Sequence, residues 1–120
     1  MTRVHSSPRK RNSKKAFLAL LASEAEPRYR RLASLVGRPA VSPAQPLEFI
    51  SLLREELAHL EPPSESTARF LLTMSETPAL RRDIRTFTLD AMLVAEGDFH
   101  GQYSSISELR TGLEELARNL

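Results

Sequence analysis

The residues best suited to chemistry in this chain are the basic side chains crowded into its first fifteen positions. Residues 1–15 contain no acid. Their six basic residues are Arg3, Arg9, Lys10, Arg11, Lys14 and Lys15. Positive charge at this density neutralises phosphates and releases counterions, which gives a salt-sensitive affinity for nucleic acid that is independent of base sequence. No aromatic residue is interleaved with these side chains, which argues against stacking on single-stranded bases.

Further arginines extend the basic character beyond residue 15. Arg30 and Arg31 fall on the outward face of a predicted helix, with Arg28 and Arg38 close by in the sequence. The rest of the chain differs in charge, because residues 16–120 hold eleven Arg and fifteen acids, a net charge of −4. An alternative interpretation is therefore that the basic segment aids solubility or docks on an acidic protein, for example another copy of this chain.

A second group of arginines raises the question of a helix-turn-helix motif. Arg81, Arg82 and Arg85 lie near the start of the predicted helix 78–96, which follows a predicted helix over 66–76. A recognition helix reads bases with residues at its N-terminal end. However, the connection lacks the usual Gly, and the last two turns of the second helix are strongly apolar. We therefore prefer the interpretation that these arginines form a solvated face on a core helix.

The other candidates for chemistry do not form a recognisable active site. The three histidines are His5, His59 and His100. No two of them have helical i, i+4 spacing, and no Cys is available to complete a zinc site. Asp98 and His100 could form an acid–base pair beside Ser104 or Ser105, but no nucleophile elbow or Gly-rich loop accompanies them. We expect a structural turn there, and we expect no metal, no cofactor and no enzymatic activity.

Composition indicates a globular helical protein. The chain has 120 residues, of which 41% are hydrophobic and 27% charged. The absence of Cys excludes disulfides and fits a reducing compartment, so we expect a cytoplasmic location. The longest apolar run, residues 16–22, is too short for a membrane span. As a secretory signal this run would be minimal, and an acid follows it at the supposed cleavage site.

Helical periodicity accounts for the rest of the sequence, and no alternating strand pattern appears. The predicted helices cover residues 14–25, 27–36, 46–60, 66–76, 78–96 and 105–120. Short connections, several of them with Pro, indicate that successive helices are antiparallel or crossing neighbours. The predicted fold is all-α, a single compact bundle of five or six helices. Residues 16–120 form this helical domain, and residues 1–15 form a disordered basic N-terminal arm.

The helix over 78–96 is expected to be the central one. Thr77 suits its N-cap, Pro78 its first position and Gly97 a left-handed stop. Its apolar stripe consists of Leu80, Ile84, Phe87, Ala91 and Val94. Because Leu89 and Leu93 lie on the opposite side, the last two turns are predicted to be buried all round.

The sequence also predicts caps for two other helices. Ser66 is the expected N-cap of the helix that ends near residue 76. Ser105 and Glu108 have capping-box spacing at the start of the last helix. The apolar seam of this last helix continues to Leu120 without a Gly or Pro stop, so it either packs in its own core or pairs with another chain.

The segment LDAMLVAEGDFHGQYSSISELRTGL, residues 89–113, resembles a pattern in the N-terminal region of bacterial proteins labelled site-specific recombinases. In that pattern a helix ends in a small residue and a Gly turn, and a loop and an acidic helix start follow. The resemblance rests on Leu, Glu and Gly positions and includes no catalytic group, so it implies no site residue.

Together these patterns predict a non-enzymatic helical interaction or regulatory module. Its basic N-terminal arm is expected to contact an acidic partner, with DNA or RNA first among the candidates. The predicted nucleic-acid-binding residues are Arg3, Arg9, Lys10, Arg11, Lys14, Lys15, Arg30 and Arg31. The alternative is a protein–protein interaction domain with no nucleic-acid role. It would be a helical homodimer or the N-terminal domain of a larger bacterial protein, and would use the 46–60 or the 105–120 face.

Overall fold

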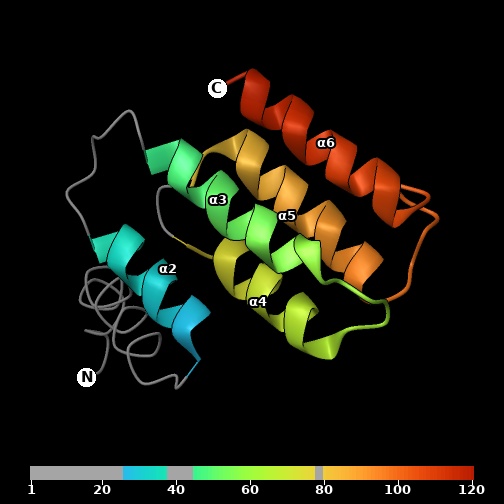
Figure 1. The fold of residues 1–120 in the computed structure, drawn as a ribbon, viewed down its shortest axis with the longest axis horizontal. Helices are drawn as coiled ribbons and strands as arrows, with labels where there is room; N and C mark the ends of the chain where they lie inside the picture. The colour runs from blue at the N-terminus through green and yellow to red at the C-terminus, as the bar shows by residue number, and fades with distance from the viewer. Residues whose placement is uncertain (1–25, 38–44, 78–79) are drawn as a thin grey trace, which may run out of the picture. The chain divides into compact units, whose positions relative to one another are not determined.

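The computed structural model of the chain describes residues 26–37, 45–77 and 80–120, and their regular structure is entirely helical. The helices are α2 (Pro27–Gly37), α3 (Gln45–Ala58), α4 (Glu65–Ser75), α5 (Arg82–Ala95) and α6 (Ile106–Arg118), as Figure 1 shows. No strand occurs in these described ranges, so the all-α prediction is confirmed for them. The predicted helix over 14–25 and the predicted arm over 1–15 lie outside the described residues.

The chain divides into two compact units, Met1–Arg38 and Pro39–Leu120. In the first unit, α2 is amphipathic. It starts at Pro27, where a missing N–H costs nothing. Helical spacing predicts that Tyr29, Leu32, Ala33 and Val36 face inward; Tyr29, Leu32 and Val36 are buried, whereas Ala33 is half-buried. Leu35 is buried as well.

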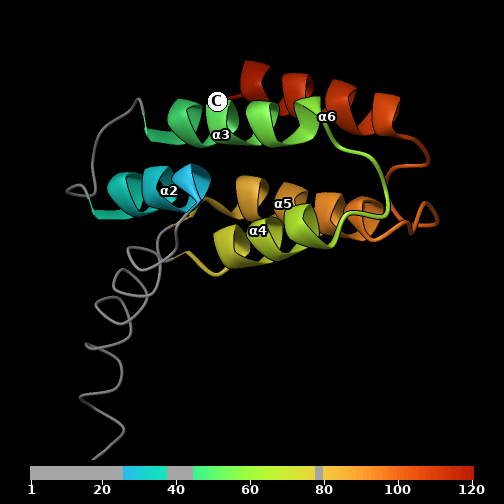
Figure 2. The ribbon, with the colours of Figure 1, turned by 60° about the horizontal axis from the view of Figure 1, so that its bottom comes forward.

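In the second unit, consecutive helices run in opposite directions (Figure 1). Figure 2 shows two layers, with α3 beside α6 in one and α4 beside α5 in the other. The α5 helix packs against both α4 and α6, and α3 packs against α6. These four helices therefore form an up-and-down arrangement in which α5 has neighbours on two sides.

The predicted inward stripe of α5 is confirmed. Ile84, Phe87, Ala91 and Val94 are all buried, and so is Leu80 just before the helix. The opposite side differs from the prediction, because Leu89 is 40% exposed and Leu93 is only half-buried. The prediction of a helix buried all round is thus wrong. The neighbours α4 and α6 flank α5 without closing over its outer face.

The start of α5 also differs from the prediction. The helix begins at Arg82 rather than at Pro78, and Arg81 occupies the N-cap position in an extended conformation (φ −58°, ψ 147°). Thr77 is fully buried, and its carbonyl accepts a hydrogen bond from the Leu80 N–H at 3.3 Å. Thr77 and Leu80 are therefore both buried, and both lie outside the helix.

The end of α5 is as predicted. Gly97 has φ 90°, a left-handed conformation that favours glycine. Its N–H donates to the Val94 carbonyl at 2.9 Å, and the Asp98 N–H donates to the Leu93 carbonyl at 2.9 Å. These two bonds form a Schellman motif, which satisfies carbonyls at the helix end.

The N-cap of α4 is Ser64 and not the predicted Ser66. The Ser64 hydroxyl accepts the Thr67 N–H at 3.2 Å, and Ser64 itself has an extended backbone. The Ser64 N–H also donates to the Ala95 carbonyl at 2.6 Å, which ties the start of α4 to the end of α5. Ser66 instead lies exposed in the first turn.

The predicted cap of α6 is confirmed in part. The Ser105 hydroxyl accepts the Glu108 N–H at 3.1 Å. In a standard capping box the acid then returns to the N-cap N–H, whereas Glu108 accepts hydrogen bonds from the N–H and hydroxyl of Ser104. These bonds lower the pKa of the Glu108 carboxyl.

The predicted apolar seam of α6 is buried only at its centre. Leu109 and Leu113 are buried, whereas Ile106, Leu116 and Leu120 are half-buried. Helical spacing also predicts the inward residues of the helices over 46–60 and 66–76, and all of them are buried. They are Phe49, Ile50, Leu53, Leu57, Leu60, Phe70, Leu71 and Met74.

Replacing Ile84 by Asp tests the assignment of α5 as the core helix. The substitution would place an unpaired carboxylate at a position with no solvent exposure, so we expect a loss of at least ~4 kcal/mol and an unfolded or molten chain. Thr86→Asp, two residues away on the exposed face, is the control and should shift the free energy of unfolding by no more than about 0.5 kcal/mol. Thermal unfolding followed by circular dichroism measures both, and equal melting temperatures would contradict the assignment.

Candidate functional site

The predicted nucleic-acid-binding residues are only partly within the described structure. Arg30 and Arg31 lie on α2, and both side chains are exposed, as predicted. The other six lie outside the described residues, and their predicted role is untested. They are Arg3, Arg9, Lys10, Arg11, Lys14 and Lys15.

The third arginine of α2, Arg28, has local partners. Its Nε lies 3.0 Å from a carboxylate oxygen of Glu26, and its guanidinium lies 5.5 Å from the centre of the Tyr29 ring. Both partners hold this side chain close to the start of the helix. Arg30 and Arg31 follow on the solvent side, since Tyr29 and Leu32 define the buried side of α2. The helix itself contains no acid.

The division into two units separates the charges of the chain. Met1–Arg38 holds ten Lys or Arg and two acids, a net charge of +8. Pro39–Leu120 holds seven Arg and thirteen acids, a net charge of −6. The basic character therefore extends past the predicted arm into α2, whose first half carries Arg30 and Arg31 at the surface.

The arginines at the start of α5 do not belong to a helix-turn-helix motif. The helices α4 and α5 run antiparallel and side by side (Figures 1 and 2), whereas a recognition helix crosses its partner at about 90–120°. Arg81 pairs with Asp83, through contacts of 3.1 and 3.2 Å. Arg82 and Arg85 are exposed on the outer side of α5. This geometry agrees with the interpretation of a solvated face on a core helix.

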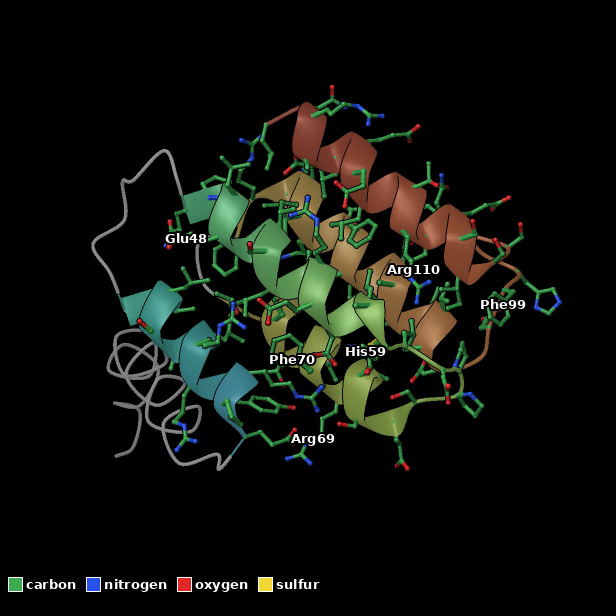
Figure 3. The ribbon with its side chains drawn as sticks, in the orientation of Figure 1. Glu48, His59, Arg69, Phe70, Phe99 and Arg110 are labelled. Carbon is green, nitrogen blue, oxygen red and sulfur yellow. The ribbon has the colours of Figure 1, made fainter. Side chains whose placement is uncertain are left out.

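A cavity of about 290 Å³ lies between α3 and α6 and is lined by two arginines. Arg54 forms a two-pronged ion pair with Glu114, with both contacts at 2.8 Å. Arg110 donates to the Leu57 carbonyl at 2.9 and 3.1 Å and to the Ala58 carbonyl at 3.3 Å, and thus caps the end of α3 (Figure 3). Both guanidiniums bind other groups of this protein, so we interpret the cavity as part of the packing between α3 and α6.

Sequence reasoning missed this arginine cluster. Arg54 and Glu114 are 60 positions apart, and Arg110 is 53 positions from the carbonyl that it caps. No local spacing signals a contact between such distant residues. The only available signal was that α3 and α6 each carry charged residues beside their apolar stripes.

The loop after α5 does not assemble a catalytic group. The Asp98 carboxylate accepts the His100 N–H at 2.9 Å and lies 3.2 Å from His100 Nδ1, and these bonds lower the pKa of Asp98. The His100 side chain is 97% exposed, and the Ser104 hydroxyl donates to Glu108 instead. The arrangement is that of an Asp-capped turn, in which Asp98 binds His100 and Ser104 binds Glu108.

Tyr103 fills the space between α5 and α6. Its ring meets Phe87 edge-on at 5.9 Å, and it lies so close to Gly112 that an added Cβ there would come within 2.5 Å of the hydroxyl. Burial raises the pKa of the Tyr103 hydroxyl, and the nearby charges of Asp90 and Glu115 raise it further. Open hollows of about 280 and 340 Å³ flank the ring. The sequence prediction that Tyr103 packs against the core is consistent with this geometry.

The described residues contain neither a metal-binding cluster nor a membrane-spanning helix. No group of three or more His, Cys, Asp or Glu in residues 26–37, 45–77 and 80–120 is placed to hold a metal ion. Within the same residues, no helix has the length and apolar character needed to cross a membrane.

Comparison with known proteins adds no assignment: no protein-family model, curated protein or solved structure matches the chain. The resemblance noted for residues 89–113 therefore receives no support from these comparisons. In the structure this segment forms the second half of α5, the following loop and the first half of α6.

The contact between Tyr103 and Gly112 predicts that the effect of Gly112→Ala on stability changes sign when the Tyr103 ring is removed. Gly112→Ala should destabilise the protein by about 1–3 kcal/mol, because the new methyl would overlap the tyrosine. In a Tyr103→Ala background the same change should stabilise α6 by up to about 1 kcal/mol, since Ala is a better helix former than Gly. Denaturant unfolding of the four proteins measures this cycle. The same sign in both backgrounds would contradict the contact.

Neutralising each of two carboxylates on α5, Asp90 and Asp83, should change the free energy of unfolding in opposite directions. Burial raises the pKa of the Asp90 carboxyl, so its charge is unfavourable in the folded state at neutral pH, and Asp90→Asn should raise the free energy of unfolding. A raised folded pKa gives stability that is complete at acid pH and lost as pH rises, so this gain should vanish below about pH 4. Asp83→Asn should cost about 0.5–1 kcal/mol at neutral pH, because Asp83 pairs with Arg81 and accepts the Ile84 N–H. Unfolding at pH 3 and pH 7 measures both, and equal signs at pH 7 would contradict this account.

Proposed function

We propose that the protein is a non-enzymatic, nucleic-acid-binding module that contacts phosphates through its basic N-terminal region. The observation that carries the proposal is the separation of charge between the two units, +8 in Met1–Arg38 and −6 in Pro39–Leu120. An acidic polymer is attracted to the first unit and repelled by the second. The binding surface is therefore confined to the N-terminal third of the chain.

The described part of the basic unit supports this proposal. Arg30 and Arg31 are adjacent and exposed on α2, a helix without acidic residues. Arg28 is held near Glu26 and Tyr29, so it contributes less to the exposed charge. A short basic helix of this kind presents a fixed pair of guanidiniums to phosphates. Residues 1–15, which composition predicts to be disordered when free, would adapt to the path of the nucleic-acid backbone.

The expected binding is strong at low salt and independent of base sequence. No pattern in the chain places side chains at base edges, since the helix-turn-helix geometry is absent from α4 and α5. Phosphate contacts alone give a slope of log affinity against log salt of about −0.9 for each phosphate neutralised on duplex DNA. Eight basic residues are predicted to take part, so the slope should be steep.

Neutralising part of the basic region tests the proposal in the full chain. The triple variant Arg9→Gln/Lys10→Gln/Arg11→Gln should bind unrelated duplex DNA at least about tenfold more weakly than the wild type at low salt, and its salt slope should fall by about 2–3. Arg30→Gln/Arg31→Gln should lose about 1–2 in slope. Fluorescence anisotropy at several salt concentrations measures both quantities on duplexes of two different sequences.

The matched control is Arg69→Gln/Arg118→Gln, which removes two positive charges at exposed positions of the acidic unit and leaves α5 unchanged. It should leave the salt slope within about 0.5 of the wild type. Undetectable binding by the wild type to DNA and RNA, or a slope that the first two variants leave unchanged, would overturn the proposal. The alternative function as a protein–protein interaction domain would then be favoured.

A further inference from the structure

The outer face of α5 carries a second regular stripe, opposite the one that faces the core. The residues at alternating spacings of three and four, here named the α5 seam, are Arg82, Arg85, Leu89, Met92 and Glu96. None of the five is buried, and Leu89 is 40% exposed. This spacing is that of the positions with which one helix packs along another in a coiled coil.

The fold leaves the α5 seam accessible. Within the described part of Pro39–Leu120, α4 and α6 pack against α5 from its flanks, and α3 and α6 cover the inner side of the α4–α5 layer (Figure 2). No other described helix of that unit lies over the outer side. The adjacent helix contributes a further apolar residue to this side, because Leu72 of α4 is 43% exposed.

Leu72 lies between the two ends of the α4–α5 hairpin. At one end the Ser64 N–H donates to the Ala95 carbonyl, which joins the start of α4 to the end of α5. Leu72 of α4 and Leu89 of α5 therefore both leave exposed apolar surface on this hairpin.

The order of residues along the α5 seam is self-complementary. It begins with two arginines, continues with Leu89 and Met92, and ends with Glu96. When two copies of α5 lie antiparallel, Leu89 of each faces Met92 of the other, and Arg85 of each faces Glu96 of the other. A parallel pairing would place like charges together. The antiparallel arrangement has two-fold symmetry, so every favourable contact occurs twice.

We propose that two copies of this chain associate through the outer face of α5, with their α5 helices antiparallel. A nucleic acid on the same face would meet Arg82 and Arg85 but also Glu96 and the apolar centre, which disfavour phosphates. The contact is short, about four helical turns, so a weak dimer is expected. The α5 face is a different surface from the basic region, and its pairing does not depend on nucleic-acid binding there.

A charge exchange between two variants tests the pairing directly. In its homodimer, Arg85→Glu would set the introduced carboxylate against Glu96 of the other copy, and Glu96→Arg would set the introduced guanidinium against Arg85 of the other copy. When the two single variants pair with each other, opposite charges meet at both contacts, so their mixture tests rescue but not mismatch. We therefore choose a mixture of the wild type with the double variant Arg85→Glu/Glu96→Arg as the test of mismatch, and the double variant alone as the test of rescue.

The double variant exchanges the two charges within one chain. In its homodimer each introduced carboxylate faces an introduced guanidinium, so opposite charges meet again at both contacts. We expect each single variant to dimerise at least ~10-fold more weakly than the wild type, and the double variant to recover the wild-type dissociation constant within about threefold. The wild type and the double variant should not form a mixed dimer, because like charges would then face each other at both contacts.

Sedimentation equilibrium of the full chain, from about 10 µM to about 1 mM, measures these constants. The wild type should rise from the monomer mass of 13.5 kDa towards twice that value. Arg118→Glu and Glu61→Arg make the same charge changes at exposed positions away from α5 and should dimerise like the wild type. Both exchanged residues are exposed, so we expect all variants to fold like the wild type. Circular dichroism checks that they do.

Three results would overturn the proposal. The first is a wild type that remains a monomer throughout this concentration range. The second is single variants that dimerise as well as the wild type. The third is a double variant that associates no better than either single variant. A dimer that Leu89→Glu weakens and Leu47→Glu leaves unchanged would further support the α5 seam, since Leu47 is similarly exposed but lies on α3. Equal effects of these two changes would count against it.

Discussion

The arrangement of residues 39–120 depends on α5 burying one continuous face between two neighbouring helices. Ile84, Ala91 and Val94 on that face are inaccessible or nearly so, and α5 contacts both α4 and α6. The close approach of α4 is visible in the 2.6 Å bond between the Ser64 N–H and the Ala95 carbonyl. Such a bond between helix ends needs small side chains nearby, and alanine meets that requirement. Because apolar burial and this bond act together, the register of the α4–α5 hairpin is well defined.

The second layer is held by a different type of contact. Between α3 and α6, Leu57 and Leu113 supply buried apolar surface, while Arg54 and Arg110 bind across the joint. The ion pair of Arg54 with Glu114 is exposed, so its contribution to stability is small. Arg110 has a larger role, since it satisfies carbonyls that a helix end otherwise leaves to water. Apolar burial thus packs α3 against α6, and the arginines add polar contacts across the joint.

For the described residues, the sequence predicted the helices and most of their inward faces, because apolar periodicity is a local signal. It predicted Gly97 as the stop of α5 for the same reason. It failed at the starts of α4 and α5. Several residues there suited the N-cap position, and tertiary packing determined which one occupies it. Thr77, for example, is buried rather than capping. It also failed at Leu89, because periodicity shows which residues are apolar but not whether a neighbour exists to cover them. Contacts such as Arg54 with Glu114 join distant segments and leave no local signal. For the basic region, composition remains the main guide.

The two faces of α5 and the division of charge suggest how the parts of the chain would work together. The inner face determines the fold, so it cannot vary freely, whereas the outer face carries an order of charges that the fold does not need. Pairing through that face would join two acidic units, and their net charges of −6 would oppose association at low salt. The same pairing would place two basic regions in one particle, and two linked phosphate-binding segments bind a long polyanion more tightly than either alone. A bound polyanion would therefore favour the dimer, and by linkage the dimer would favour the polyanion.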